Sequence, residues 1–363
     1  MGLSVHLPHP PPDLPLEGGG GQPDRSARCC LSGATENPGA PPMKRSATAF
    51  WVGAVLAVVL AIFAAFGIQN EYPFFAGYVV LQFIVLATAW NILGGYAGYV
   101  NFGTGAFFGI GAYTSVVLIQ ALNAPLLLQI AAAAALSAVL GFGTGLLTLR
   151  LRGIFFSIAT VAVAIIFQTL IINWRYVGGA TGVQLLRPPV MAPFDSYTKM
   201  LFVVMAVLAV GAVAIARYIE TSWIGRGLRA IRDSEGAAEC TGVPTLKLKL
   251  FACTVSGAMM GAAGAPLPMY LSFVEPASTF DLSYSVSALA MPIIGGTSHW
   301  LGPVIGAILL GSVQQLVTVN VSSELNVLVV GVLLVLFVVA APDGIVGLAK
   351  KLRRRRSTAG VPG

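Results

Sequence analysis

The chain has 363 residues, of which 56% are hydrophobic and only 10% are charged, and its formal net charge is +7. Soluble domains carry about 25% charged residues, so the composition excludes a soluble globular protein. It also excludes disordered, collagen-like and disulfide-scaffold chains. No Asp, Glu, Lys or Arg occurs between Tyr72 and Leu149. As one helix this run would measure about 117 Å, whereas the hydrocarbon core of a membrane is about 30 Å thick. The run therefore folds back on itself, and the sequence predicts an all-α, polytopic transmembrane helical bundle.

The N-terminal segment, residues 1–45, is rich in Pro and Gly and has no apolar periodicity, so we expect a disordered tail. Met43-Lys44-Arg45 followed by the apolar run Ala49–Ile68 is typical of the natural start of a membrane protein. We therefore hypothesise that translation begins at Met43. A cleaved signal peptide is the alternative, but its apolar region is usually shorter, about 7–15 residues. An uncleaved first span is the preferred interpretation.

Ten apolar segments follow one another along the chain, most of them near the length of about 20 residues that a crossing requires. They are Ala49–Ile68, Phe74–Leu93, Phe102–Leu122, Leu126–Leu149, Ile154–Ile172, Met200–Ile219, Leu250–Phe273, Tyr284–Gly295, Leu301–Val319 and Leu325–Ala341. The eighth segment is short and ends in Gly295-Gly296-Thr297. It is either a tilted short helix or a re-entrant half-helix sheltered by protein.

The distribution of basic residues supports ten crossings with both termini in the cytoplasm. In that topology 18 of the 21 Lys and Arg residues lie inside, and only Arg175, Arg187 and Lys199 lie outside. This is the positive-inside rule. A nine-span chain would move the basic tail, residues 349–363, to the outside. We expect a transmembrane domain over residues 46–348, followed by this basic cytoplasmic tail.

Four GxxxG pairs indicate close helix packing, because glycine lets two backbones approach where lipid supplies no hydrophobic drive. They are Gly105–Gly109, Gly141–Gly145, Gly257–Gly261 and Gly302–Gly306. A tightly packed bundle is what a transporter or channel requires.

No catalytic constellation is present in the sequence. It lacks a phosphate-binding loop, an H-E-x-x-H motif and a G-x-S-x-G elbow, so we expect no enzyme activity and no cofactor on this chain. The four Cys residues have no metal-like spacing, and no metal site is predicted. The basic residues lie at the ends of apolar runs, which speaks against a nucleic-acid partner. No ionisable residue lies near the middle of a clear span, which weakens the alternative of an ion-coupled secondary transporter.

The charged segment of about 221–249 is predicted to form a short amphipathic cytoplasmic helix and then a turn. Leu228, Ile231 and Ala238 share one helical face, Arg229 and Asp233 are spaced as an i,i+4 pair, and Gly242 supplies a stop signal. A solvated connector lying on the membrane is one interpretation. Docking of a soluble partner is the other, because the small residues Ala237, Ala238 and Gly242 permit close approach.

The Ala237-Ala238 pair with Gly242 resembles the coupling loop of ABC importer permeases. Further motifs, in the same order along the chain, are similar to the branched-chain amino acid permease family, and among its members to the M-type subunit. They are Ala89–Gly103, Gly109–Thr114, Leu149–Gly153, Gly178–Gly182, Gly295–Thr297 and Trp300–Ala307. The resemblance extends over about Phe50 to Leu348. Pro266, Pro268, Glu239 and Cys240 depart from the family pattern, which puts the substrate in doubt.

The resemblance implies an ATP-driven importer in the bacterial inner membrane. In it this chain pairs with a homologous H-type permease, two separate ABC ATPase subunits and an extracytoplasmic substrate-binding protein. The residues expected to couple to the ATPases are Arg226, Arg229, Glu235, Ala237, Ala238 and Gly242. Related permeases carry urea, short amides or aromatic acids, so these substrates stand beside branched-chain amino acids.

A glycine-rich break at Gly94–Gly103 is the predicted border of the translocation pathway, where Asn91 and Asn101 offer polar groups. The pathway residues are Asn91, Gly94, Gly98, Asn101, Gly103, Gly295 and Gly296. The alternative for both glycine-rich stretches is a tight interhelical turn.

Overall fold

The computed structural model describes residues 43–67, 70–148, 151, 153–185, 196–320, 325–340 and 344–348. They fall into two units, Met1–Val52 and Gly53–Gly363. Of the first unit, the structure describes only the beginning of helix α1, which extends over Met43–Gly67. Some predictions fall outside these residues and stay predictions. They concern the tail before Met43, the basic C-terminal tail, and the residues Arg150, Arg152 and Arg187.

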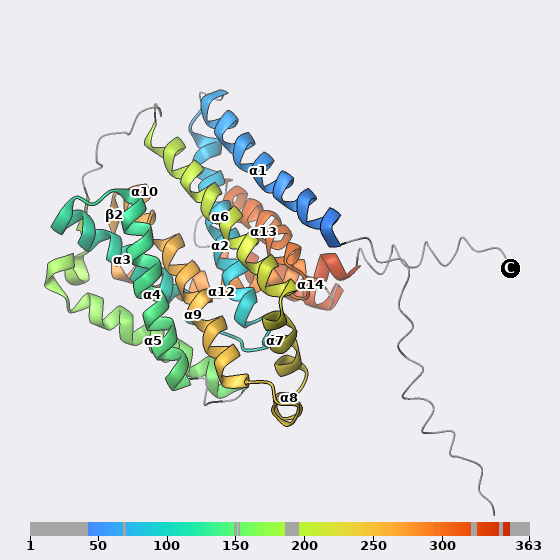
Figure 1. Cartoon of the computed structure of the whole chain (residues 1–363). Helices are drawn as coiled ribbons and strands as arrows, with labels where there is room; N and C mark the ends of the chain where they lie inside the picture. Colours follow the sequence, from blue (N-terminus) through green and yellow to red (C-terminus); the bar gives the residue numbers. More distant parts are fainter. Residues whose placement is uncertain are drawn as a thin grey trace, which may run out of the picture. The chain divides into compact units, whose positions relative to one another are not determined.

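The described residues are helical almost throughout (Figure 1), as the all-α prediction requires. Eight of the described helices are long and apolar enough to cross a membrane. They are α1, α2 (Tyr72–Leu93), α3 (Thr104–Leu122), α4 (Leu126–Thr148), α5 (Ile154–Ile172), α6 (Tyr197–Thr221), α9 (Thr245–Gly264) with its continuation to Leu271, and α13 (Leu301–Asn320). The other two predicted segments form the shorter helices α12 (Leu282–Gly295) and α14 (Leu325–Ala340).

The core of the second unit lies where α2, α3 and α9 meet, and these are the most buried of the long helices. Helix α9 packs against α3 and α4, while α2 packs against α6, α9, α12 and α13. Glycines permit these contacts, as predicted from the GxxxG pairs. A Cβ atom on Gly302, for example, would overlap the backbone carbonyl of Gly296, and one on Gly261 would overlap the side chain of Ser137.

Helix α9 joins two different ends of the bundle. Helices α7 (Trp223–Asp233) and α8 (Glu235–Cys240) precede it, and α10 (Leu267–Leu271) and β2 (Phe273–Val274) follow it. At 1.5 Å per residue its 20 residues span about 30 Å. Figure 1 shows α8 at the bottom of the view, with α10 and β2 at the upper left.

The end that carries β2 contains a small antiparallel pairing that the sequence did not predict. Strand β1 (Val183–Gln184) pairs with β2, with Val183 opposite Val274. It follows the short 3-10 helices η1 (Arg175–Val177) and η2 (Gly179–Thr181). Gly182 adopts φ +74°, and a Cβ atom there would lie 2.6 Å from the carbonyl oxygen of Val274. The Gly178–Gly182 motif therefore forms the turn that seats β1 against β2.

Helix α12 is short because it begins inside the bundle, against the first turn of α3. The hydroxyl of Ser285 donates to the carbonyl of Phe102 at 2.7 Å and accepts from the N–H of Gly105 at 3.1 Å. The helix follows β2 and α11 (Pro276–Thr279), and it ends beside the start of α13. The chain thus passes from the β2 end towards the α7 end, which favours the alternative of a short crossing helix over a re-entrant one.

Candidate functional site

The α7–α8 segment, residues 223–242, is amphipathic as predicted. Leu228 and Ile231 of α7 and Ala238 of α8 are buried, whereas Arg226 and Ala237 are exposed. Trp223 and Gly242, at the two ends of the segment, are also exposed. One face of the segment therefore packs on the bundle, and the opposite face is open.

The prediction of a single helix within the charged segment 221–249 is wrong, because the chain breaks at Ser234. This residue is extended, with φ −164° and ψ 110°, and its hydroxyl accepts from the N–H of Ala237 at 3.4 Å. Serine is a preferred N-cap because its side chain replaces a missing helical acceptor. The segment is thus two helices with a fixed corner, and it is shorter than predicted, since α6 reaches Thr221 and α9 begins at Thr245.

Arg229 does not form the i,i+4 ion pair with Asp233 that its spacing suggested. Its Nη2 atom donates instead to the backbone carbonyl of Glu220 at 3.0 Å. That carbonyl lies in the last turn of α6, where helical acceptors lack partners. Arg229 therefore ties α7 back to the end of α6. Although it was predicted as a coupling residue, its guanidinium is engaged within the chain and is not open to a docking partner.

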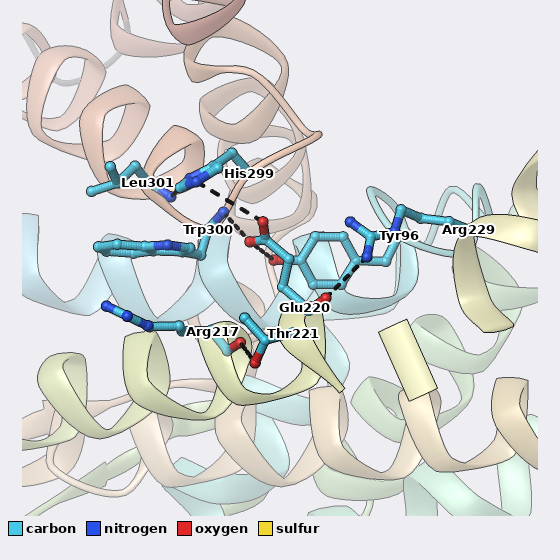
Figure 2. A network of polar contacts seen from close by, with 8 residues as sticks. All are labelled: Tyr96, Arg217, Glu220, Thr221, Arg229, His299, Trp300 and Leu301. Atoms are coloured by element: carbon cyan, nitrogen blue, oxygen red, sulfur yellow. Dashed lines mark hydrogen bonds and ion pairs between the residues drawn. The ribbon is translucent and has the colours of Figure 1, made fainter. Parts of the chain in front are cut away.

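Glu220 lies at the centre of a polar network that joins three segments (Figure 2). Its Oε2 atom accepts from the backbone N–H of Trp300 at 2.7 Å and from the Tyr96 hydroxyl at 3.3 Å. His299 Nε2 lies 4.0 Å from Oε1. The Arg217 guanidinium stacks 5.6 Å from the centre of the Trp300 ring. Burial, followed by the charge of Glu220 and its hydrogen bond, raises the pKa of Tyr96 well above its usual value.

A second network joins α8 and α9 to the loop between α2 and α3, which also contains Tyr96. Lys249 Nζ lies 2.6 Å from Glu235 Oε1, and the Tyr99 hydroxyl donates to Glu235 Oε2 at 2.6 Å. Lys249 Nζ also donates to the Tyr99 oxygen at 3.2 Å. The Lys249 side chain is 3% exposed and that of Glu235 16%. Lys249, predicted at the edge of a solvated loop, is thus a buried helical residue whose charge Glu235 balances.

The Gly94–Gly103 loop lies against α7. The guanidinium of Arg232 donates to the carbonyl of Gly95 at 2.9 Å. Gly98 adopts φ +77°, and a Cβ atom there would lie 3.2 Å from Arg232 Cγ. Glycine is required at this position both by its left-handed backbone and by the approach of α7. Because Tyr96 and Tyr99 also lie in this loop, both networks contact the junction of α2 and α3.

The remaining predicted pathway residues occupy two further places. Asn101 is buried, its carbonyl accepts from Trp90 Nε1 at 2.8 Å, and its Oδ1 accepts from the N–H of Gly103 at 2.7 Å. Asn101 and Gly103 line one small pocket together with Thr144, Thr148, Thr160 and Cys253, among others. Asn91 is buried in the last turn of α2. Gly295 packs on Gly302, in a glycine-lined turn between α12 and α13 that includes Gly296. Their role as a pathway stays a prediction.

Sequence reasoning did not assign roles to Tyr96, Tyr99, Glu220 and Lys249. Tyr96 and Tyr99 lay inside a glycine-rich motif that was interpreted through its glycines. The usable signal was the pair of tyrosines three residues apart at the end of a span, because Tyr combines an apolar ring with a polar tip suited to a membrane boundary. Their partners are 124 and 136 residues away. Of the two unexpected loop residues, Glu239 accepts from Thr245 Oγ1 at 2.9 Å, and Cys240 is an exposed thiol.

Together the fold and the site define a multi-pass membrane protein with one amphipathic helical segment fastened to the junctions of several crossing helices. The family described as branched-chain amino acid transport system, permease component, matches residues 72–338. That match covers most of the sequence, so the chain belongs to this family. No solved structure matches the chain.

Several curated relatives are similar over most of the chain. The high-affinity branched-chain amino acid transport system permease protein LivM of Salmonella typhimurium is 26% identical over 304 residues, 77% of this chain and 71% of the relative. LivM of Escherichia coli K12 is 26% identical over 75% and 69%. A probable branched-chain amino acid transport permease protein LivH of Methanocaldococcus jannaschii is 27% identical over 71% and 86%.

Proposed function

We propose that the chain is the M-type permease subunit of an ATP-driven ABC importer in the bacterial inner membrane, with both termini in the cytoplasm, and that its substrates are branched-chain amino acids. The names of the LivM and LivH relatives support the substrate class. The similarity to LivM over about three quarters of the chain supports the M-type assignment.

The observation that carries the proposal is the α7–α8 segment. Its buried face is fixed by Leu228, Ile231 and Ala238, and its open face presents Arg226 and Ala237. A helix that merely rests on a membrane has no need of the buried Lys249–Glu235 ion pair behind it. Docked ATPase subunits, in contrast, can move the bundle only through a segment that is fastened to several of its helices.

The proposed mechanism needs partners on other chains. Two ABC ATPase subunits bind the open face of α7–α8 on the permeases and hydrolyse ATP. A homologous H-type permease completes the pathway, and an extracytoplasmic binding protein delivers the substrate. ATP-driven closure of the ATPases then favours one of two arrangements of the bundle, because their contacts with α7–α8 differ between the two.

Reconstitution in vesicles tests the proposal. The chain is reconstituted with an H-type permease, ABC ATPase subunits and a binding protein from the same organism, and uptake of radiolabelled leucine is measured with and without ATP inside the vesicles. ATP-dependent uptake that excess isoleucine competes for is expected. Uptake of urea, a short amide or an aromatic acid in place of leucine would overturn the substrate assignment. Uptake driven by an ion gradient without ATPase subunits would overturn the ABC mechanism.

A docking variant tests the coupling site separately. Ala237→Asp adds charge and bulk on the open face of α8 and disturbs no buried contact. We expect it to abolish co-purification of the ATPase while the chain still inserts into the membrane. Ala180→Asp is the matched control, because Ala180 is also an exposed alanine and lies in η2, next to the β1–β2 pairing. Undiminished binding of the ATPase to the Ala237→Asp variant would refute the assignment.

A further inference from the structure

Tyr99 is placed where the α7–α8 segment, α9 and the junction of α2 and α3 meet. Its hydroxyl donates to Glu235 on α8 and accepts from Lys249 on α9. Lys249 Nζ also lies 4.9 Å from the centre of the Tyr99 ring. Hydrogen bonds to ionised partners are shorter and stronger than those between neutral groups, so these contacts hold the loop firmly to the first residue of α8 and to α9.

The residues next to Tyr99 fasten the same loop to the start of α5. Its ring packs edge-on against Phe156, with 5.2 Å between ring centres. The carbonyl of Val100 accepts from Ser157 at 2.9 Å, and the N–H of Phe102 donates to Thr160 Oγ1 at 3.1 Å. The side chain of Tyr99 therefore connects Glu235 to a loop that is fastened to the start of α5 and lies between α2 and α3.

We propose that Tyr99 is a positioning residue that transmits movement of α8 to α2, α3 and α5 through its hydrogen bond with Glu235; the transport consequence rests on the proposed function above. Arg232, which donates to the carbonyl of Gly95, holds the earlier part of the loop to α7. In the described part of the chain, Arg232 forms no hydrogen bond or ion pair with α8, which begins just after the turn at Ser234. Tyr99 thus links the corner of the segment to the membrane helices.

The Tyr99→Phe variant isolates this link. It keeps the ring contact with Phe156, the position of Lys249 over the ring, and the Lys249–Glu235 ion pair. It removes only the hydroxyl. Tyr113→Phe is the matched control, because Tyr113 is also a buried tyrosine, but its hydroxyl makes no hydrogen bond.

The first measurement is hydrogen exchange on the purified chain in detergent. The N–H groups of Gly95, Tyr96 and Tyr99 bond to carbonyls at the end of α2 and report whether the loop is held. We expect Tyr99→Phe to raise their exchange rates about ten- to a hundredfold, the range for losing one hydrogen bond to a charged group. Exchange in α13 and in the Tyr113→Phe control is expected to stay unchanged, which shows that the fold persists. Unchanged loop exchange in Tyr99→Phe would overturn the proposed link.

The second measurement uses the reconstituted complex and counts leucine molecules taken up per ATP hydrolysed. Tyr99→Phe is expected to lower this ratio about tenfold while ATPase docking and hydrolysis continue. A normal ratio combined with faster loop exchange would overturn transmission through Tyr99. If the wild-type complex shows no ATP-dependent uptake, the proposed function fails, and the exchange experiment still decides whether Tyr99 holds the loop to α8.

Discussion

Glu220 and Trp300 join the end of one helix to the start of another. The carboxylate of Glu220, in the last turn of α6, accepts the backbone N–H of Trp300, the residue that precedes α13, at 2.7 Å. The N–H groups at a helix start have no intrahelical partner, and a negative charge there is favourable. Because the same carboxylate accepts from Tyr96, the ends of α2, α6 and α13 are held at one point.

Replacing Glu220 is expected to destabilise the chain. Glu220→Ala leaves the buried hydroxyl of Tyr96 and the N–H of Trp300 without their acceptor, which costs about 2–3 kcal/mol of unfolding free energy. Glu220→Gln, which retains an acceptor oxygen, costs less. Thermal unfolding of the detergent-purified chain, followed by tryptophan fluorescence, measures both. Glu71→Ala is the control, since Glu71 is exposed and its side chain does not cap α2. An equal shift in all three variants would contradict a specific role for Glu220.

Stability should fall at alkaline pH in a way that depends on Tyr96. Burial and the charge of Glu220 raise its pKa in the folded state, whereas an unfolded tyrosine ionises near pH 10. Above about pH 10 the unfolded chain therefore loses a proton that the folded chain retains, and this favours unfolding by about 1.4 kcal/mol per pH unit. Tyr96→Phe removes this contribution. The difference in unfolding midpoint between wild type and Tyr96→Phe, measured from pH 8 to 11, should shift in favour of the variant only above pH 10. A constant difference across that range would refute the assignment.

The positions of most helices could be predicted because the membrane leaves few options for an uncharged chain. The predicted fifth segment, Ile154–Ile172, has the same bounds as α5, since Gly153 and Asn173 mark its ends. The seventh was predicted as Leu250–Phe273, whereas α9 begins at Thr245 and ends at Gly264. The start was misplaced because Lys249 was interpreted as solvated, although Glu235 balances its charge inside the bundle. The end of the span was close to the prediction, because α10 continues it to Leu271, although Pro266 separates α9 from α10.

The site could be predicted only in part, because some of its contacts join residues that are far apart in the sequence. The buried face of α7–α8 follows from local spacing, and local spacing is visible in a sequence. The partners of Arg229, Tyr96 and Tyr99 are set by how α6 and α7 meet at Ser222 and by how the loop folds over them. No periodicity encodes such contacts between distant residues.

The buried pair of Lys249 and Glu235 should show asymmetric costs. Glu235→Met leaves Lys249, 3% exposed, as an unpaired buried charge, and is expected to cost about 3 kcal/mol of unfolding free energy. Lys249→Met leaves the less buried Glu235 with its Tyr99 hydrogen bond and should cost less. The double variant, which removes both charges, should be more stable than Glu235→Met alone. Unfolding midpoints of the three variants decide this, with Lys247→Met as the exposed control on the same helix. Additive losses in the double variant would show that the two charges do not compensate each other.

Two glycines in helix interiors should respond oppositely to alanine. A Cβ atom on Gly111 in α3 would overlap the backbone carbonyl of Gly261 in α9, so Gly111→Ala must push the two helices apart. Overpacking of this kind costs about 1–3 kcal/mol. Gly143 in α4 has open space where a Cβ atom would lie, and alanine is the better helix former by about 1 kcal/mol. We therefore expect Gly111→Ala to lower the unfolding midpoint in detergent and Gly143→Ala to raise it slightly or leave it unchanged. If Gly111→Ala were as stable as Gly143→Ala, close approach of α3 and α9 would not be what requires glycine at position 111.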